Sequence, residues 1–149
     1  MRVVLDTNVL ARGISARAGP VHALRASLHL PHQHVVSDLL IDELARMLRY
    51  PRLLALHRRT DAQIDQYVAD VRKFAVMVNL ASLPIPKVVP NDPSDDVVIA
   101  TAIAGHAERI VTRDKHLRTP DVRAYCAAFG VSILDDLEFL AELRGQQSP

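Results

Sequence analysis

The sequence predicts an α/β protein, a three-layer α/β/α sandwich around a central, mostly parallel sheet. Short apolar segments rich in β-branched residues alternate with segments of helical periodicity, as in chains whose parallel strands are joined by crossover helices. The 149 residues, of which 49% are hydrophobic, suffice for one well-filled core. Since the chain has no internal repeat and no linker, we expect one domain over residues 1–144 and a frayed tail over residues 145–149.

The first third of the chain contains two expected strands and two expected helices. Val-Val-Leu at residues 3–5 is typical of a strand buried on both faces. A helix of about ten residues is expected to open at the Gly-Pro pair 19–20. A second strand at residues 34–37 precedes a helix over residues 38–49, which ends before Pro51 because helical conformation is disfavoured for a residue that precedes proline.

The middle of the chain is expected to be mainly helical. Asp61 caps the clearest helix, along which apolar residues recur at helical spacing as far as Val78. Residues 82–92 are rich in proline and hold at most a short strand at residues 88–89. The helix over residues 97–104 is apolar nearly all round, so it is expected to be buried.

The last third repeats the alternation of strand and helix. Strands are expected at residues 109–112 and 131–134, because both segments are short, apolar and rich in β-branched residues. Helices are expected over residues 122–129 and 137–143. The crossovers that join these strands place helices on both faces of the sheet.

Composition excludes several classes of protein. The net charge of +1 favours no class of partner, and the scarcity of aromatic residues argues against a base-stacking platform for single-stranded nucleic acid. Cys126 is the only cysteine, so the chain cannot form an internal disulfide or a site built from several thiolates. No apolar run approaches the roughly 20 residues needed to span a bilayer, and the short apolar start does not resemble a signal sequence. We therefore expect a cytoplasmic protein with no membrane contact.

Four acidic residues are expected at one edge of the sheet. Asp6 directly follows the first strand, and Asp114 lies two residues beyond the strand at residues 109–112. Glu43 lies on the helix after the second strand, and Asp95 lies at the start of the buried helix. In parallel sheets, sites form beyond the carboxyl ends of the strands, where all four acids would meet.

Each acid also has a simpler explanation. Asp6 and Asp114 are compatible with turns, Asp95 with a helix cap and Glu43 with the edge of a helix surface. These explanations are independent of one another, whereas one metal site accounts for all four acids. Hard divalent cations such as Mg²⁺ or Mn²⁺ prefer oxygen ligands, and carboxylates gathered without an ion repel one another. Such an ion activates water and orients a phosphate for hydrolysis.

Four motifs resemble those of a known family. They are Val-Val-Leu-Asp-Thr-Asn-Val-Leu at residues 3–10, Val-Val-Ser-Asp-Leu-Leu-Ile-Asp-Glu-Leu at 35–44, Asp-Pro-Ser-Asp-Asp-Val-Val-Ile-Ala-Thr-Ala at 92–102 and Ile-Val-Thr-Arg-Asp-Lys-His-Leu at 110–117. In this order they resemble the PIN domain, and in particular the VapC-like PIN toxins of bacterial toxin–antitoxin pairs. The resemblance extends from residue 1 to about residue 134.

This resemblance implies a PIN-like α/β/α fold and a metal-dependent endoribonuclease, with Mg²⁺ or Mn²⁺ as cofactor and RNA as substrate. It also implies a cognate antitoxin that blocks the site, and commonly a homodimer. The catalytic and metal-binding acids of the family carry over to the four acids named above. Asn8 and Thr112 match polar residues that support the cluster.

The third acid of the family lies within a pair of adjacent aspartates. The family spacing from this acid to the small residues of the buried helix favours Asp95, with Ala102 seven residues later. Consecutive side chains on a helix diverge by about 100°, so Asp95 and Asp96 cannot face one ion equally. Asp96 is therefore expected to be a supporting residue. Ser94 occupies a position where many relatives have a further acid.

Basic residues accompany the acids on the expected edge and are candidates for contacts with the phosphates of a substrate. Two follow the first strand and four surround Asp114. The candidates are Arg12, Arg17, Arg113, Lys115, His116 and Arg118.

Three other functions remain open on the sequence alone. A magnesium-dependent phosphatase of the haloacid dehalogenase type also begins with an aspartate after its first strand, but it would carry a second acid where this chain has Asn8. A receiver domain would have no need of Glu43 on a helix. A non-catalytic PIN-like module that binds RNA or protein would be expected to lack one or more of the acids.

Overall fold

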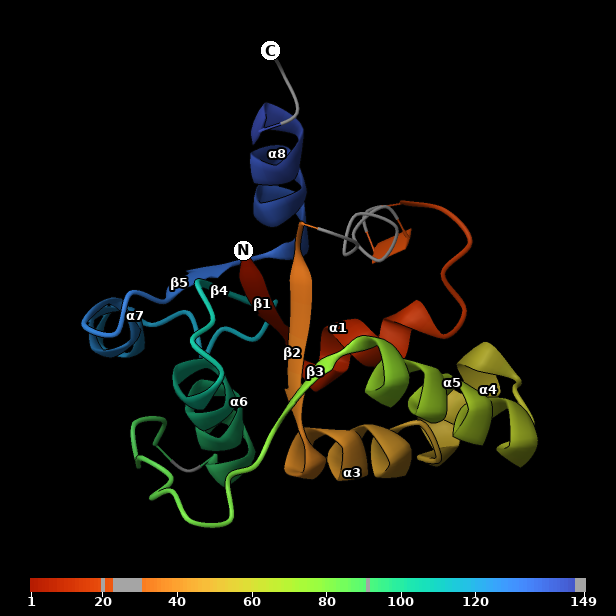
Figure 1. Cartoon of the computed structure of the whole chain (residues 1–149). Helices are drawn as coiled ribbons and strands as arrows, with labels where there is room; N and C mark the ends of the chain where they lie inside the picture. Colours follow the sequence, from red (N-terminus) through yellow and green to blue (C-terminus); the bar gives the residue numbers. More distant parts are fainter. Residues whose placement is uncertain (20, 23–30, 91, 147–149) are drawn as a thin grey trace.

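The computed structural model describes residues 1–19, 21–22, 31–90 and 92–146. Five strands form one sheet in the order β3-β2-β1-β4-β5, and every neighbouring pair is parallel. The strands are β1 (Arg2–Leu5), β2 (Gln33–Ser37), β3 (Val76–Val78), β4 (Arg109–Val111) and β5 (Ser132–Leu134). The expected α/β architecture with a central parallel sheet is confirmed (Figure 1).

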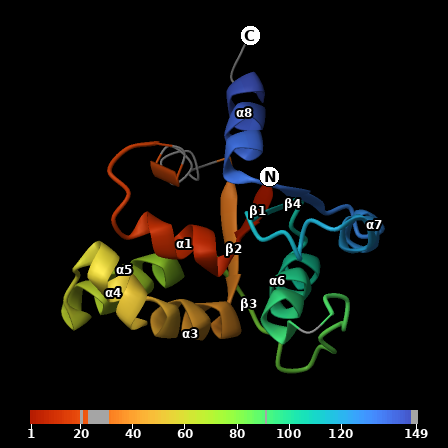
Figure 2. The same ribbon diagram turned by 180° about the vertical axis from the view of Figure 1, so that it is seen from behind.

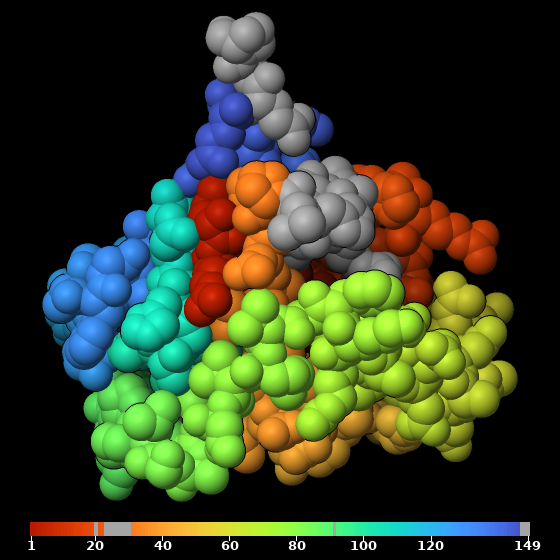
Figure 3. Space-filling view, viewed as in Figure 1, coloured from red at the N-terminus to blue at the C-terminus, as the bar shows by residue number. Residues whose placement is uncertain are grey.

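Seven helices surround the sheet in the described part of the chain. They are α1 (Thr7–Gly13), α3 (Asp38–Met47), α4 (Pro51–His57), α5 (Asp61–Phe74), α6 (Pro93–Ala104), α7 (Pro120–Ala127) and α8 (Asp136–Gln146). Figure 2 shows the molecule from behind, with α1 beside β2, and Figure 3 shows the end of α8 standing out from the rest of the surface.

Two apolar cores lie on opposite faces of the sheet. One combines Val4 and Ile110 of the strands with residues of α6 and α7, such as Ile99. The other combines Val3 of the same strand with residues of α1, α5 and α8, such as Phe139. The alternation along β1 matches the two-residue period of a strand, which explains why its apolar residues are fully buried.

The helix expected as far as Val78 ends earlier, at Phe74. Ala75 is extended, and the three residues after it form β3, which pairs with β2. The expectation was wrong because valines at these positions fit the helical period and the strand period equally well, and pairing with β2 decides between them. The cap of α5 is Thr60, which forms a capping box with Gln63, so Asp61 is its first helical residue.

Other differences concern shorter elements. The segment at residues 88–89 forms no strand. Pro51 opens the unexpected helix α4, since a proline is accommodated in the first turn of a helix. The helix expected to open at residues 19–20 falls largely outside the described residues. Helix α8 continues to Gln146, two residues beyond the expected end of the domain, and residues 147–149 lie outside the described part.

Gly105 allows the end of α6 to lie directly against the sheet. A Cβ atom at this position would lie 2.3 Å from Cγ1 of Val35 and 3.1 Å from Cγ2 of Val78. Only a residue without a side chain fits this contact. The close approach fixes the depth of α6 on the sheet and therefore the position of the acidic residues at its other end.

None of the helices in the described ranges is both long enough and apolar enough to span a membrane.

Candidate functional site

The site lies where the strand order changes direction. From β1 the chain adds β2 and β3 on one side, and then β4 and β5 on the other. In open parallel sheets this arrangement leaves a crevice at the carboxyl ends of the two strands that flank the change, here β1 and β4. Asp6 directly follows β1 and Thr112 directly follows β4, at the carboxyl ends of these two strands.

Asp6 is held from two sides. Its side chain is buried, Thr112 Oγ1 donates a hydrogen bond of 2.7 Å to Oδ2, and Thr7 Oγ1 lies 3.4 Å from Oδ1. Its backbone N–H donates to the carbonyl oxygen of Val111 at 3.0 Å, which ties the residue to β4. Burial raises the pKa of Asp6, the hydrogen bond from Thr112 opposes this rise, and the nearby charge of Asp114 adds to it.

Glu43 enters the site from α3. Ser37 is the N-cap of this helix, and its Oγ accepts a hydrogen bond of 3.4 Å from the N–H three residues later. Glu43 is half-buried one turn and a half into the helix. Burial raises its pKa, the charges of Asp6 and Asp92 raise it further, and Arg46 lowers it. The structure thus brings this helix residue close to the acids of the sheet edge.

Asp95 has the most unusual environment in the site. Its side chain is buried, and its Oδ2 atom has no hydrogen-bond partner among the described residues. Burial raises the pKa of Asp95 to about 7, and the charges of Asp114, Asp92, Asp6 and Glu43 contribute in that order. A buried oxygen without a partner is costly, and four like charges nearby add to the cost.

Asp96, the next residue, is equally buried but differently used. Its Oδ1 accepts hydrogen bonds from the backbone N–H groups of Val88 and Val89, at 2.8 and 2.9 Å. This carboxylate therefore fixes the segment that precedes α6, the same segment that was expected to form a strand. The two neighbouring aspartates have separate environments, as their angular separation on a helix requires.

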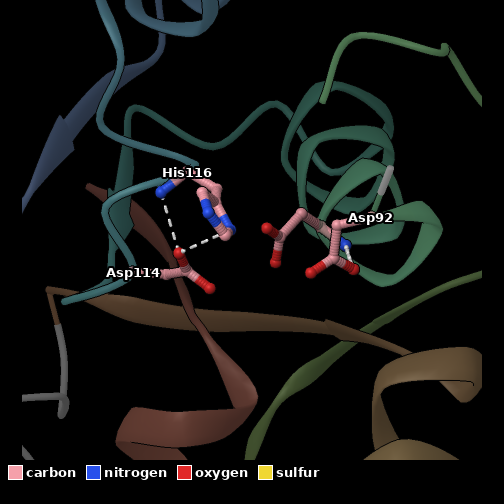
Figure 4. Close-up of side chains that lie close together, drawn as sticks. Asp92, Asp114 and His116 are labelled. Carbon is pink, nitrogen blue, oxygen red and sulfur yellow. Dashed lines mark hydrogen bonds and ion pairs between the residues drawn. The ribbon is translucent and has the colours of Figure 1, made fainter. Parts of the chain in front are cut away.

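A tight group of donor atoms lies across the entrance of the site. One side-chain atom each of Asp92, Asp95, Asp114 and His116 lies within 4.8 Å of all the others. Figure 4 shows Asp114 and His116, from the loop after β4, facing Asp92 at the start of α6. The loop is ordered by short contacts: the N–H of Asp114 donates to Thr112 Oγ1 at 2.9 Å, and the N–H of His116 donates to Asp114 Oδ1 at 2.8 Å.

Asp92 is the site residue that sequence reasoning missed. It caps α6, and its Oδ1 accepts hydrogen bonds from the N–H groups of Ser94 and Asp95 at 3.2 and 3.4 Å. The signal was present, because an aspartate directly before Pro93 is a typical helix start with proline in the first turn. Asp92 also supplies a carboxylate near the position at which Ser94 replaces an acid of the family pattern.

The donor set fits a divalent cation. Several carboxylate oxygens and one imidazole nitrogen converge, and one buried carboxylate oxygen lacks a partner. Carboxylate oxygens are the ligands that Mg²⁺ and Mn²⁺ prefer, and an ion would offset the mutual repulsion of the acids.

Two of the expected substrate-binding residues are engaged with acids of the protein. Arg113 donates from Nε and Nη2 to the two carboxylate oxygens of the buried Asp136, at 2.5 and 2.9 Å. Arg118 Nη2 lies 3.3 Å from Glu138 Oε2 and 3.7 Å from Asp135 Oδ2. These pairs fix the loop after β4 to the start of α8, so both arginines support the site through its framework.

The other polar candidates lie closer to solvent. Arg12 Nε donates to the backbone carbonyl of Asn8 at 3.4 Å, and Asn8 itself is exposed in the first turn of α1. Arg17 and Lys115 are exposed, and Lys115 directly follows Asp114. Lys115 is therefore an exposed cation beside the acidic cluster, a position suited to contacts with phosphate groups.

Comparison with known proteins supports this architecture. A family model described as PIN domain matches residues 2–116. The fold is similar to a chain in the crystal structure of VapBC2 from Rickettsia felis bound to a DNA fragment from their promoter, with a TM-score of 0.58 and 14% identity over 91% of this chain and 98% of that chain. It is also similar to a chain in the crystal structure of FitAcB from Neisseria gonorrhoeae, with a TM-score of 0.52 and 16% identity over 91% and 98% of the two chains. No curated protein matches the sequence.

Proposed function

This chain belongs to the PIN domain family, and from this premise we propose that it is a divalent-metal-dependent endoribonuclease of the cytoplasm. The observation that carries the proposal is the buried Asp95 oxygen without a partner, in the midst of other carboxylates. A purely structural aspartate would accept hydrogen bonds from the protein, as Asp96 Oδ1 does from two backbone N–H groups.

Four acids would hold the ion: Asp6, Glu43, Asp95 and Asp114. A divalent cation bound there supplies Lewis-acid stabilisation of phosphate charge and lowers the pKa of an attacking water. The protein's own groups keep these acids in place, because Thr112 donates to Asp6 and also accepts from the backbone of the Asp114 loop. Replacement of Asp95, whose Oδ2 has no partner among the described residues, therefore removes a ligand without removing these bonds.

Exposed cations would make the contacts with the substrate. Lys115 and Arg17 are the candidates for binding RNA phosphates, because the guanidinium groups of Arg113 and Arg118 are occupied by acids of the protein. Contacts of this kind are independent of base sequence and weaken as the salt concentration rises. Asn8, exposed at the start of α1, would assist from the side of β1.

The proposed biological context is that of a VapC-like toxin. A cognate antitoxin protein would cover the acidic edge and block the access of RNA, and two copies of the chain would form a homodimer. The motifs in family order and the fold shared with a chain of VapBC2 support this context.

The test is RNA cleavage by the purified full-length protein with Mg²⁺, with Mn²⁺ and with EDTA. We expect cleavage with either ion and none in EDTA, and a loss on the order of 100-fold or more in Asp95→Asn. Asp96→Asn is the matched control: it keeps an oxygen that accepts from Val88 and Val89, so its activity should stay within about tenfold of the unaltered protein. Undiminished cleavage in excess EDTA would contradict the proposal.

A further inference from the structure

We propose that Asp92 and His116 are further ligands of the bound ion and that the imidazole nitrogen of His116 makes this site select Mn²⁺ over Mg²⁺. The inference rests on the proposed function only in taking the acidic edge as a metal centre. It adds two ligands to the four acids and assigns a metal preference.

The geometry of the donor group supports both additions. The side-chain donors of Asp92 and His116 lie within 4.8 Å of those of Asp95 and Asp114, which belong to the four acids already described. The two additions come from opposite sides of the site, one from the cap of α6 and one from the loop after β4 (Figure 4). A ligand set drawn from separate, well-anchored elements is a preorganised one.

A second observation separates this group from an ordinary cluster of surface acids. Asp95 is only 6% exposed, one of its oxygens lies within the group, and its Oδ2 has no partner among the described residues. A buried carboxylate oxygen left open toward other donors marks a position that a cation fills.

His116 is not explained as an ion-pair partner of Asp114. Its Nδ1 lies 3.6 Å from Asp114 Oδ1, which is longer than a hydrogen bond, and its side chain is 58% exposed. A pair of this exposure contributes little to stability. The hydrogen bond to Asp114 comes instead from the backbone N–H of His116, at 2.8 Å, which fixes the loop beside the acids.

The donor chemistry sets the metal preference. Mg²⁺ is bound by oxygen ligands and keeps several waters, whereas imidazole nitrogen suits first-row transition metals. A carboxylate set that includes one imidazole therefore favours Mn²⁺, the transition-metal ion most compatible with a carboxylate-rich site. The same site without the imidazole would have no reason to discriminate between Mn²⁺ and Mg²⁺.

The experiment measures metal binding directly, on the full chain freed of metal with EDTA. Mn²⁺ and Mg²⁺ are titrated separately by calorimetry, and the Mn²⁺ form is analysed by pulsed electron paramagnetic resonance for coupling to ¹⁴N. The variants are His116→Gln, which removes the imidazole, and Asp92→Asn. The matched control is His106→Asn, which removes an exposed imidazole at the amino end of β4, and asparagine tolerates its φ of 51°.

We expect ¹⁴N coupling in the unaltered protein and in His106→Asn, and none in His116→Gln. His116→Gln should lose about 10- to 100-fold in Mn²⁺ affinity and little in Mg²⁺ affinity, while Asp92→Asn should weaken both ions. Absence of ¹⁴N coupling in the unaltered protein, or equal weakening of both ions by His116→Gln, would overturn the inference. RNA cleavage by a protein that shows no ¹⁴N coupling would support the proposed function and contradict the nitrogen ligand. Conversely, ¹⁴N coupling in a protein that does not cleave RNA would support the nitrogen ligand and contradict the proposed function. Failure to bind Mn²⁺ at all would refute both.

Discussion

Replacement of Asp95 by asparagine should make the metal-free protein more stable at neutral pH. The folded state raises the pKa of Asp95 from 3.8 to about 7, through burial and then through the charges of the neighbouring acids. Between these two values the folded protein holds a proton that the unfolded chain has released. The free energy of unfolding of the metal-free protein therefore falls as pH rises from 3.8 to about 7. Above this range the whole loss of unfolding free energy is present.

The size of the effect follows from the same difference. At about 1.4 kcal/mol per pKa unit, the interval from 3.8 to about 7 corresponds to about 4 kcal/mol as an upper limit. Water screens the neighbouring acids in part, since Asp114 is 23% exposed and Glu43 is half-buried. We therefore expect a gain in unfolding free energy of about 2 kcal/mol at pH 8. The amide has no charge to lose, and its N–H₂ group can donate to Asp92 or Asp114.

The assay is urea denaturation in EDTA at pH 4 and pH 8. Asp95→Asn should match the unaltered protein at pH 4 and exceed it at pH 8. Asp96→Ala is the control, and it should be less stable than the unaltered protein. It removes the acceptor of two backbone N–H groups, so its free energy of unfolding should fall by about 3 kcal/mol at both pH values. If Asp95→Asn were destabilised at pH 8, the electrostatic strain assigned to Asp95 would not exist.

Two further predictions concern the packing of α6 and the ion. Gly105→Ala should lower the unfolding free energy by about 1–3 kcal/mol, because the added Cβ would lie 2.3 Å from Val35 Cγ1. Urea denaturation measures this loss. An unchanged unfolding free energy would mean that α6 is free to shift away from the sheet. Addition of Mn²⁺ or Mg²⁺ should raise the melting temperature of the unaltered protein, because the ion binds the folded state, and the rise should largely vanish in Asp6→Asn. An equal rise in that variant would place the ion elsewhere.

The sequence predicted the sheet and its edge because these depend on strong local signals. One apolar run ends directly before Asp6 and another ends shortly before Asp114, and each marks a buried strand and its carboxyl end. In a parallel sheet these carboxyl ends lie at the same edge, which brings the acids together. The edge strand at residues 76–78 was not predicted, since its valines continue the helical spacing of α5 and only pairing with β2 distinguishes the two states. Helix α1 was also missed, because Asp6 was compatible with a turn and instead caps a helix.

The sequence predicted which residues form the site, but it did not predict which residues they contact. Nothing in the sequence indicates that Arg113 lies against Asp136, 23 residues later, or that Asp96 accepts from the backbone of residues 88–89. These contacts depend on how loops fold back over the sheet, which no short-range pattern specifies. Asp92 shows the opposite case, in which a local cap signal was present but the residue was interpreted only as the end of the proline-rich segment.

The adjacent pair Asp95 and Asp96 shows how the fold maintains a strained site. The first turn of α6 exposes backbone N–H groups that favour nearby negative charge, which offsets part of the repulsion that Asp95 experiences. Asp96 stabilises the fold through two hydrogen bonds from the preceding segment, and Gly105 seats the far end of the same helix on the sheet. Since both anchors lie on the helix that carries Asp95, the site cannot relieve its repulsion by moving the helix away. Protonation of Asp95 relieves the repulsion below its pKa of about 7, and above this pH a bound cation would relieve it.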